Sequence, residues 1–477
     1  MKKALLYKFI ITILLVMIFL ISCDNNVTEN NIDEKQPEEI NIDLDGYEFT
    51  IVGHLRDGLA EVTPDAAYSV MGDNLLEHYK KIEEKCNCKI VFGEPLASHV
   101  SFLQQATLTG DKVADILDAP LYDAVTMYKA EYLKSLTEVI DDPYSGKYGT
   151  KSQLEAVTIP KKDGADIFGF RAAYWGIPAP TFRHAVYFNP AVLKNFNQPD
   201  PFELIERKNW VWSTFEEICL AVASEGTDST DTSDDTYGTA YNPTFFHFPL
   251  AAILSNGVKL VYLDEETGLY KSGMDNPAII EALQWGQDLV KKGACRIISG
   301  SLKDGITDNV IAQFYQGQSA FLVEYSVHGA TDKQSLSYNM DEFSWIPFPV
   351  GPNGTYGSWA SAVSWIDRYF VLPVNGDSDV LRQLLPLLLE PFEGLSENDW
   401  RETFANNTFF NTESEKWFFD MYDNAENDFY FALPTFYNGS AINQIMKGTK
   451  TPQEGITAIM EKSQKEVDDE LNKYLAD

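Results

Sequence analysis

The chain has 477 residues, 13% of them aromatic, and a formal net charge of −34 at pH 7. This acidic balance argues against nucleic acid as a partner and against a basic patch that would bind an anionic membrane surface. It also disfavours anionic ligands, although a local arginine can override the overall field.

The N-terminal residues have the pattern of a secretory signal. Two lysines precede an apolar run over 9–21, as is typical of such signals. Leu20-Ile21-Ser22-Cys23 ends the run and resembles the bacterial lipobox, in which cleavage precedes a cysteine that receives a lipid. We therefore predict a signal peptide over 1–22, a lipid such as palmitate on Cys23, and a protein anchored to the extracytoplasmic face of the cell membrane. An uncleaved anchor is the alternative, because the run approaches the length of a spanning helix.

A polar segment follows the lipidation site. Residues 23–45 are rich in Asn, Asp, Glu and Gln and contain few bulky apolar side chains. Such a composition cannot bury enough surface to offset its conformational entropy, so we predict a tether. The remaining body of roughly 430 residues exceeds the usual size of a single core, which favours two lobes.

The cysteines beyond Cys23 do not form a recognisable site. Cys86 and Cys88 are separated by one residue, whereas a redox motif needs two, and no second cluster supplies metal spacing. We interpret them, with Cys219 and Cys295, as incidental thiols. A disulfide stays open as an alternative, since sequence alone assigns no partners.

Strand-like and helical segments alternate three times in the first part of the body, which predicts parallel strands in an open α/β sheet. The predicted elements are a strand at 49–52, a helix at 73–85, a strand at 89–92, a helix at 100–108, a strand at 113–117 and a helix that includes Tyr122.

The second part of the body continues the mixed pattern. Asn189-Pro190 and Asn276-Pro277 each combine a capping side chain with a proline, which predicts helix starts. The other predicted elements are strands at 186–188, 318–325 and 362–366, an extended segment at 343–350 and a C-terminal amphipathic helix over 452–475.

Several of these segments, taken in order, resemble landmarks of bacterial extracellular solute-binding proteins of the maltose-binding type (family 1). The matching segments are 113–116, Trp175-Gly176-Ile177-Pro178, Tyr187-Phe188-Asn189-Pro190, 209–215, 317–321, 345–352 and 451–455. The chain departs from the pattern at Phe188, where a second tyrosine is usual, at Val113-Ala114-Asp115, which lacks the proline, and at two apparent insertions near Asp231 and over 393–427.

This resemblance implies a two-lobed, periplasmic-binding-protein-like α/β fold with an interlobe ligand cleft and hinge strands. Lobe one would comprise 46–180 and 345–375, and lobe two 181–344 and 376–477. It also implies capture of a small solute, with a sugar or oligosaccharide favoured, and delivery to the permease subunits of an ABC transporter. Neither an enzymatic activity nor a cofactor is expected.

Candidate binding residues follow the predicted strands, because ligands in open α/β sheets bind beyond the carboxyl ends of strands. A saccharide needs aromatic faces for stacking and planar polar groups for paired hydrogen bonds. Arg56 follows the first strand, with a solvated turn as its alternative role. Asp118 and Tyr122 follow the third strand, in a loop that contacts sugar in the family that the chain resembles.

The resemblance and the strand ends provide the other candidates. Arg183 lies where the family places a polar contact, and Glu324 and Tyr325 lie where it presents a polar and an aromatic group. Trp359 follows a glycine-rich loop and is either a stacking platform or ordinary packing. Phe436 and Tyr437 precede the last helices, where the family carries an aromatic platform.

Two other classes of protein stay open. A lipid-anchored glycan-degrading enzyme needs two carboxylates that flank a bond, and no pair stands out among 71 acidic residues. No nucleophile elbow, zinc motif or phosphate loop is present, and the six histidines are scattered. A surface glycan-binding lipoprotein without a transporter would share the anchor and the aromatic residues. Peptides, phosphate esters and polyamines are alternative solutes, and a polyamine would suit the acidic charge.

Overall fold

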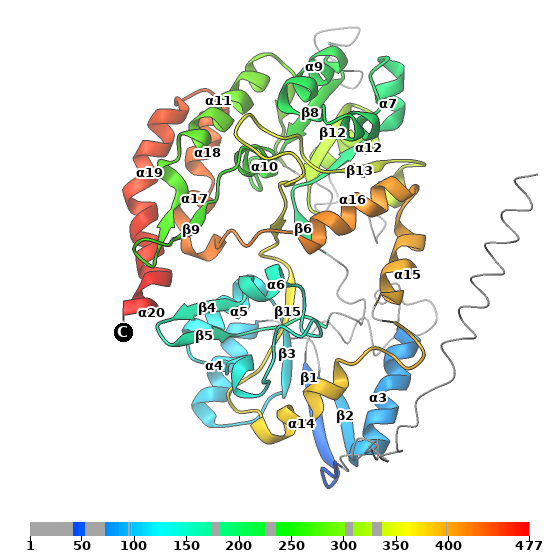
Figure 1. The fold of residues 1–477 in the computed structure, drawn as a ribbon, viewed down its shortest axis with the longest axis vertical. Helices are drawn as coiled ribbons and strands as arrows, with labels where there is room; N and C mark the ends of the chain where they lie inside the picture. The colour runs from blue at the N-terminus through cyan, green and yellow to red at the C-terminus, as the bar shows by residue number, and fades with distance from the viewer. Residues whose placement is uncertain are drawn as a thin grey trace, which may run out of the picture. The chain divides into compact units, whose positions relative to one another are not determined.

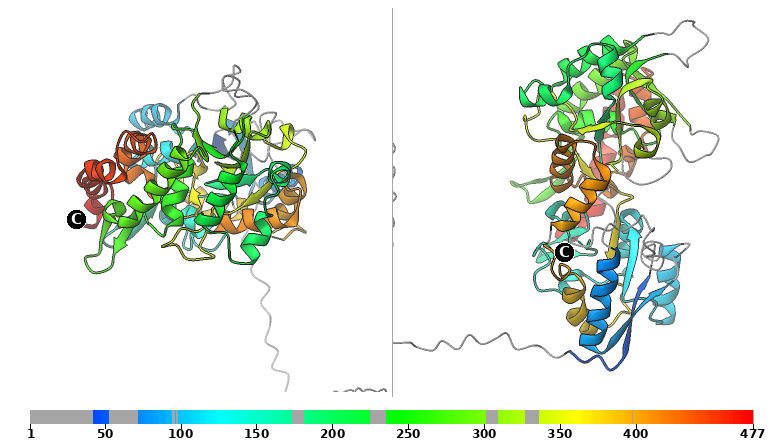
Figure 2. Two further views of the ribbon diagram at one scale, coloured as in Figure 1. Left: turned by 90° about the horizontal axis from the view of Figure 1, so that it is seen from above. Right: turned by 90° about the vertical axis from the view of Figure 1, so that its right-hand side faces the viewer.

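The computed structural model describes residues 42–52, 72–93, 96, 98–172, 181–224, 235–300, 309–326, 336–396 and 398–476. Within Ile42–Asp477, which forms one compact unit, two large sheets organise the chain. Figures 1 and 2 show each sheet with its own helices as a separate group of elements, here called the first and second lobes. The predicted α/β class is confirmed.

The first sheet follows the predicted alternation of strand and helix. Strands β1 (Tyr47–Val52), β2 (Cys88–Gly93) and β3 (Ile116–Pro120) pair in parallel, in the order β3-β1-β2. Helix α3 (Gly72–Cys86) and helix α4 (His99–Thr109) connect them. The third strand lies three residues beyond its predicted position. The polar Asp118 does not end it, because Arg368 on the neighbouring strand pairs with that carboxylate.

The second sheet has the strand order β11-β8-β12-β7-β13. Strands β11 (Cys295–Ile297) and β12 (Ser319–Glu324) flank β8 (Tyr237–Tyr241) in parallel, and β7 (Ala185–Phe188) is antiparallel to β12 and to β13 (Ser344–Ile346). Strand β8 was not predicted from the sequence, because all five of its residues are buried and no alternation of apolar and polar residues marks it.

Helices of the second lobe begin where the sequence predicts them. Asn189 caps α7 (Pro190–Asn195) and Asn276 caps α11 (Pro277–Lys291) through their side chains. Thr451 and Glu454 form a capping box at the start of α19 (Pro452–Val467). The predicted C-terminal helix continues as a π-helical turn, η5 (Asp468–Asn472), and as α20 (Lys473–Ala476). None of the described helices combines enough length with enough apolar character to cross a membrane.

The chain passes between the lobes three times. The first crossing segment contains β6 (Phe182–Arg183), and the second contains β14 (Ala362–Val363) and leads to β15 (Arg368–Val371), which pairs with β3. Strands β6 and β14 pair with each other antiparallel. The third crossing runs from α14 (Ser378–Leu388) through α15 (Asp399–Thr408) to α16 (Thr412–Asp423).

Two elements differ from the predicted lobe boundaries. Strand β13, within the 345–375 segment assigned to lobe one, pairs in the second sheet. Helix α14, expected in lobe two, packs against α3 of the first lobe. Its apolar face, which includes Leu381 and Leu385, is fully buried there. An amphipathic helix can cover either sheet, so its sequence does not say which one it joins.

The described cysteines Cys86, Cys88, Cys219 and Cys295 carry free thiols. Cys219 lies against Gly238 of β8, where a Cβ atom would come within 2.2 Å of the cysteine Cβ. This close approach explains why a glycine occupies the strand interior at this position.

A buried ion pair joins the first two crossing segments. Arg171 and Asp367 are 3% and 2% exposed, and the Arg171 guanidinium donates to the Asp367 carboxylate. Breaking such a pair leaves an uncompensated charge in the interior. We therefore expect Asp367→Asn to lower the free energy of unfolding by about 3–5 kcal/mol. Urea denaturation of the variant checks this value.

The exposed pair of Arg382 with Asp379 is the matched control, since the Asp379 side chain is 86% exposed. Asp379→Asn should cost under about 1 kcal/mol. Equal losses for the two variants would contradict a structural role for the buried pair.

Candidate functional site

Arg183 occupies the point where the first two crossing segments pair. Its side chain is 0% exposed and forms an ion pair with Asp428. Its Nε atom donates to the Val363 carbonyl at 3.0 Å. The guanidinium carbon lies 4.5 Å from the ring centroid of Trp365 and 5.7 Å from that of Tyr437. These five residues are here called the Arg183 cluster.

Asp428 holds the Arg183 cluster together electrostatically. Its carboxylate accepts hydrogen bonds from Arg183 and from the Tyr437 hydroxyl. Burial is the largest influence on the pKa of Arg183 and lowers it, but the Asp428 carboxylate together with Tyr437 and Tyr325 raises that pKa above its usual value. The Nη1 atom of Arg183 is buried and has no hydrogen-bond partner among the described residues. One charged donor of the cluster is therefore not satisfied by the described part of the chain.

The first lobe reaches the cluster through the start of α5 (Leu121–Lys129). The N–H groups of Leu121 and Tyr122 donate to the carbonyls of Asp367 and Trp365 at 2.8 and 3.2 Å. These bonds fix the helix end on the second crossing segment and leave the Tyr122 side chain 47% exposed. Tyr430 lies between the two lobes here. Burial raises its pKa, and the Asp428 carboxylate and then Asp123 of α5 add to the effect.

The second lobe contributes the end of β12. The Tyr325 ring centroid lies 6.4 Å from Trp365 and 6.2 Å from Phe245. The Tyr187 hydroxyl donates to the Tyr325 carbonyl at 2.6 Å, which fixes the backbone at this point. Glu324, which precedes it, lies 3.4 Å from the His247 Nε2 atom. Tyrosines from both lobes therefore meet the second crossing segment at Trp365, Tyr122 through its backbone and Tyr325 through its ring.

His184 follows Arg183 directly and has an unusual environment. Its φ of 71° is in the left-handed region, where a histidine is uncommon, and its side chain is 0% exposed. Its ring centroid lies 5.6 Å from that of His247. Burial lowers the pKa of His184 well below its usual value, and the neighbouring Arg183 and His247 add to the effect. The imidazole is therefore neutral at pH 7.

Five of the predicted site residues lie in or beside the Arg183 cluster: Tyr122, Arg183, Glu324, Tyr325 and Tyr437. The Tyr437 face is already occupied by the guanidinium, so this ring acts with Trp365 to hold Arg183. Phe436 is 0% exposed and contacts the edge of Tyr437 from behind, at 5.3 Å between centroids.

The structure places the other predicted residues elsewhere. Asp118 is 4% exposed within β3, and both of its carboxylate oxygens accept from Arg368 Nε at 2.9 Å, so these acceptors are already engaged. Trp359 packs against Tyr356 and Trp417, with centroids 5.2 and 5.5 Å away. Arg56 and Cys23 lie outside the described residues.

Sequence reasoning missed Asp428, Trp365 and Tyr430, whereas the aromatic segment 245–248 stands out in the sequence either as part of a site or as buried core. A buried arginine demands a carboxylate partner, but the sequence offers 71 acidic residues and no spacing rule to choose among them. The aromatic run Phe429-Tyr430-Phe431 that follows Asp428 was the one local feature that could have indicated this partner. Of the aromatic segment 245–248, Phe248 is fully buried core, whereas Phe245 and His247 contact Tyr325.

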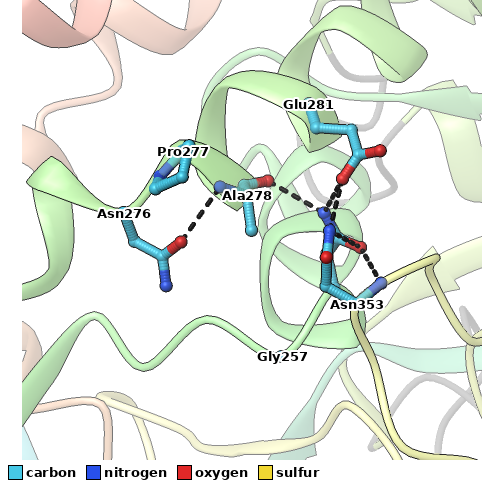
Figure 3. A pocket seen from close by; sticks show the side chains of 7 residues that line it. Gly257, Asn276, Pro277, Ala278, Glu281 and Asn353 are labelled. Atoms are coloured by element: carbon cyan, nitrogen blue, oxygen red, sulfur yellow. Dashed lines mark hydrogen bonds between the residues drawn. The ribbon is translucent and has the colours of Figure 1, made fainter.

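A separate pocket of about 450 Å³ lies on the second lobe, at the start of α11 (Figure 3). The Asn256 amide donates to the Ala278 carbonyl at 3.0 Å and to Glu281 at 2.9 Å, and the Asn353 amide also donates to Glu281. Because these polar groups satisfy one another, the pocket is a weaker candidate than the Arg183 cluster. No group of three or more metal-ligating side chains occurs in the part of the chain that the structure describes.

Comparisons with known proteins locate the fold. No protein-family profile and no curated protein matches the sequence. Among solved structures, a sugar transporter protein of Rhizobium etli in an open conformation is similar, with a TM-score of 0.59 and 16% identity over 88% of this chain and 99% of that one. The GacH receptor of Streptomyces glaucescens, solved unliganded and with acarbose, has a TM-score of 0.57 and 14% identity over 89% and 99%.

UgpB of Mycobacterium tuberculosis, in complex with glycerophosphocholine, has a TM-score of 0.55 and 13% identity over 89% of this chain and 99% of that one. The protein therefore has the two-lobed α/β fold of the solute-binding proteins of ABC transporters. The resemblance inferred from the sequence landmarks is confirmed at the level of the fold. At these identities the similarity shows the fold alone.

The environment of His184 predicts a pH dependence of stability. Its pKa is lower in the folded protein than in the unfolded chain, where it is about 6.5. Below that pH the unfolded chain binds a proton that the folded protein does not. Stability should then fall as the pH decreases from 7 to 5, by up to about 1.4 kcal/mol per pH unit from this residue.

His184→Asn removes the titration and keeps a residue that tolerates a positive φ. Urea denaturation between pH 5 and 8 should show a shallower loss of stability for the variant. Part of the slope should persist, because burial also lowers the pKa of His78. An unchanged slope would mean that His184 is protonated or reaches solvent in the folded protein.

Proposed function

We propose that this protein is a lipid-anchored extracytoplasmic solute-binding protein that captures a sugar or oligosaccharide and delivers it to an ABC transporter. The Arg183 cluster, where the crossing segments and both lobes meet, is the observation that carries the proposal. A solute favours a closed arrangement of two lobes only if it contacts both, and this is where their side chains converge.

The chemistry of the cluster suits a saccharide. Tyr122 offers an exposed ring from the first lobe, and Tyr325 and Tyr430 add aromatic side chains next to Trp365. The Nη1 atom of Arg183 offers a charged donor for a hydroxyl oxygen. A ring that presents C–H groups on its face and hydroxyls at its edge matches this combination.

The similar structures support the same class of solute. Their recorded ligands include acarbose, α-D-tagatose and maltotetraose. The similar structures are binding proteins, and we propose that this protein likewise binds its solute without converting it. The carboxylate within the cluster also opposes a hydrolytic role, because Asp428 pairs with Arg183 and is not free to act on a bond.

A thermal-shift screen of the full chain over a saccharide library tests the proposal, since a ligand that binds only the folded state raises the melting temperature. We expect at least one neutral saccharide to do so. Tyr122→Ala should weaken its binding about 2- to 10-fold through loss of stacking. Tyr144→Ala is the control, because Tyr144 is 52% exposed and distant in sequence, and it should leave affinity unchanged.

Two outcomes would overturn this proposal. Stabilisation by a polyamine or a peptide, with none by any saccharide, would change the class of solute. Conversion of a bound saccharide to shorter products would favour the glycan-degrading alternative.

The lipid anchor is tested separately. Cells grown with an alkyne analogue of palmitate should label the wild-type protein, and Cys23→Ala should abolish the label completely. Cys88→Ala, which removes a half-buried thiol of the body, should keep it. An unlabelled wild-type protein that retains residues 1–22 would instead support the uncleaved anchor.

A further inference from the structure

The C-terminal helical segment belongs to the second lobe at its start and contacts the first lobe at its end. Helix α19 packs against α11 and against α18 (Ser440–Met446). Helix α20 packs against β4 (Thr158–Lys161), as Figure 1 shows for the red end of the chain. Strand β4 pairs with β5 (Gly164–Ile167), which packs against η1 (Leu136–Glu138) just after α5, so this hairpin belongs to the first lobe.

The segment is fixed to the second lobe by side-chain bonds that mimic strand pairing. The Asn472 side chain accepts from the Tyr270 N–H at 2.7 Å and donates to the Tyr270 carbonyl at 2.9 Å. About two turns earlier in the segment, Gln464 accepts from the Ser272 N–H at 2.9 Å. Both partners lie on β10 (Leu269–Ser272). The end of the segment therefore stays in place on the second lobe whatever happens at its other contacts.

The contact with the first lobe centres on one ion pair. Glu470 of η5 pairs with Lys129 at the end of α5, and their side chains are 26% and 29% exposed. The Lys129 ammonium also lies 5.3 Å from the ring centroid of Phe431, which belongs to η4 (Tyr430–Ala432), next to the Arg183 cluster. Lys129 therefore has two partners, and each lies on a segment beyond the third crossing.

The π-helical turn carries both sets of contacts. Within its five residues, Asn472 bonds to the second lobe and Glu470 to the first. Such turns are rare and often occur at functional positions. Glu470 and Asn472 are two residues apart, and side chains at this spacing lie on different sides of a helix, so one can contact each lobe.

We infer that the C-terminal segment, residues 452–476, is a strap that holds the two lobes in the arrangement in which the Arg183 cluster is enclosed, and that the Lys129–Glu470 ion pair is its releasable contact. The pair is only partly exposed, with side chains 29% and 26% accessible, and it lies between elements of different lobes, so a relative movement of the lobes would separate it. This makes it suited to adjust an equilibrium between lobe positions. Only the expected effect of the strap on solute release rests on the proposed function.

Hydrogen–deuterium exchange of the full chain tests the strap without any solute. Glu470→Gln keeps the size of the side chain and removes its charge. We expect amides of the β4–β5 hairpin to exchange about two- to fivefold faster in this variant. The same increase is expected at Val363 and Glu426, whose N–H groups donate to the Glu426 and Ser361 carbonyls between β14 and the loop after α16. Lys129→Met should reproduce both effects.

The matched control lies on the same helix. Lys465 pairs with Asp469 one turn away, and both side chains are well exposed, at 73% and 59%. Lys465→Met removes an ion pair that does not reach the first lobe, and it should leave the exchange of all these amides unchanged.

Two results would overturn the inference. Faster exchange at the hairpin alone, without change at Val363 and Glu426, would reduce the ion pair to a local packing contact. Equal exchange in Glu470→Gln and Lys465→Met would mean that the Lys129–Glu470 ion pair does not stabilise the β4–β5 hairpin.

The best saccharide from the thermal-shift screen provides a second measurement. Its dissociation rate should rise about two- to fivefold in Glu470→Gln if the strap favours the enclosed arrangement. Saccharide binding with an unchanged dissociation rate would overturn the strap and leave the proposed function intact. If exchange changes as expected but no saccharide binds the protein, the strap would stand and the proposed function would be overturned.

Discussion

A guanidinium that is withdrawn from water needs a carboxylate beside it, and Arg183 finds one in Asp428, 245 residues further along the chain. An arrangement that separated the two would leave a charge buried without compensation, at a cost of several kcal/mol. The Val363 carbonyl, the Trp365 ring and the Tyr437 hydroxyl complete the environment. The pair therefore selects one packing of the crossing segments and the loop after α16, which is the packing that forms the candidate site.

The topology explains why this interaction lies between the lobes. Arg183 is on β6, and its strand partner β14 belongs to the segment that returns to the first sheet. The start of α5 is bonded to that same segment, and the end of β12 meets it through Tyr325 and Trp365. Each lobe thus presents the end of one element to a shared pair of short strands. A site built in this way contains side chains from both lobes, and no additional loop is needed to connect the lobes at the site.

The sequence predicted the elements better than their assembly. Alternating strands and helices and the Asn-Pro helix starts depend on neighbouring residues, so they were found close to their observed positions. The sheet assignment of β13 and α14 and the Asp428 partner of Arg183 depend on contacts between distant residues, and no local pattern encodes these. Asp118 shows the same limit. A polar residue after an apolar run indicated a strand end and a free acceptor, but Arg368 pairs with it and the strand continues.

The Arg183–Asp428 and Lys129–Glu470 pairs differ in what a rotation of the lobes would do to them. Arg183 lies on a crossing strand, so a rotation of the lobes about these strands moves it little relative to Val363 and Trp365. Lys129 and Glu470 lie in different lobes, and neither is part of a crossing segment. A small rotation would separate them, and their partial exposure lets water replace the lost contact at little cost. The buried Arg183–Asp428 pair therefore keeps the site assembled, while the partly exposed Lys129–Glu470 pair is the one whose strength can change how long the lobes stay together.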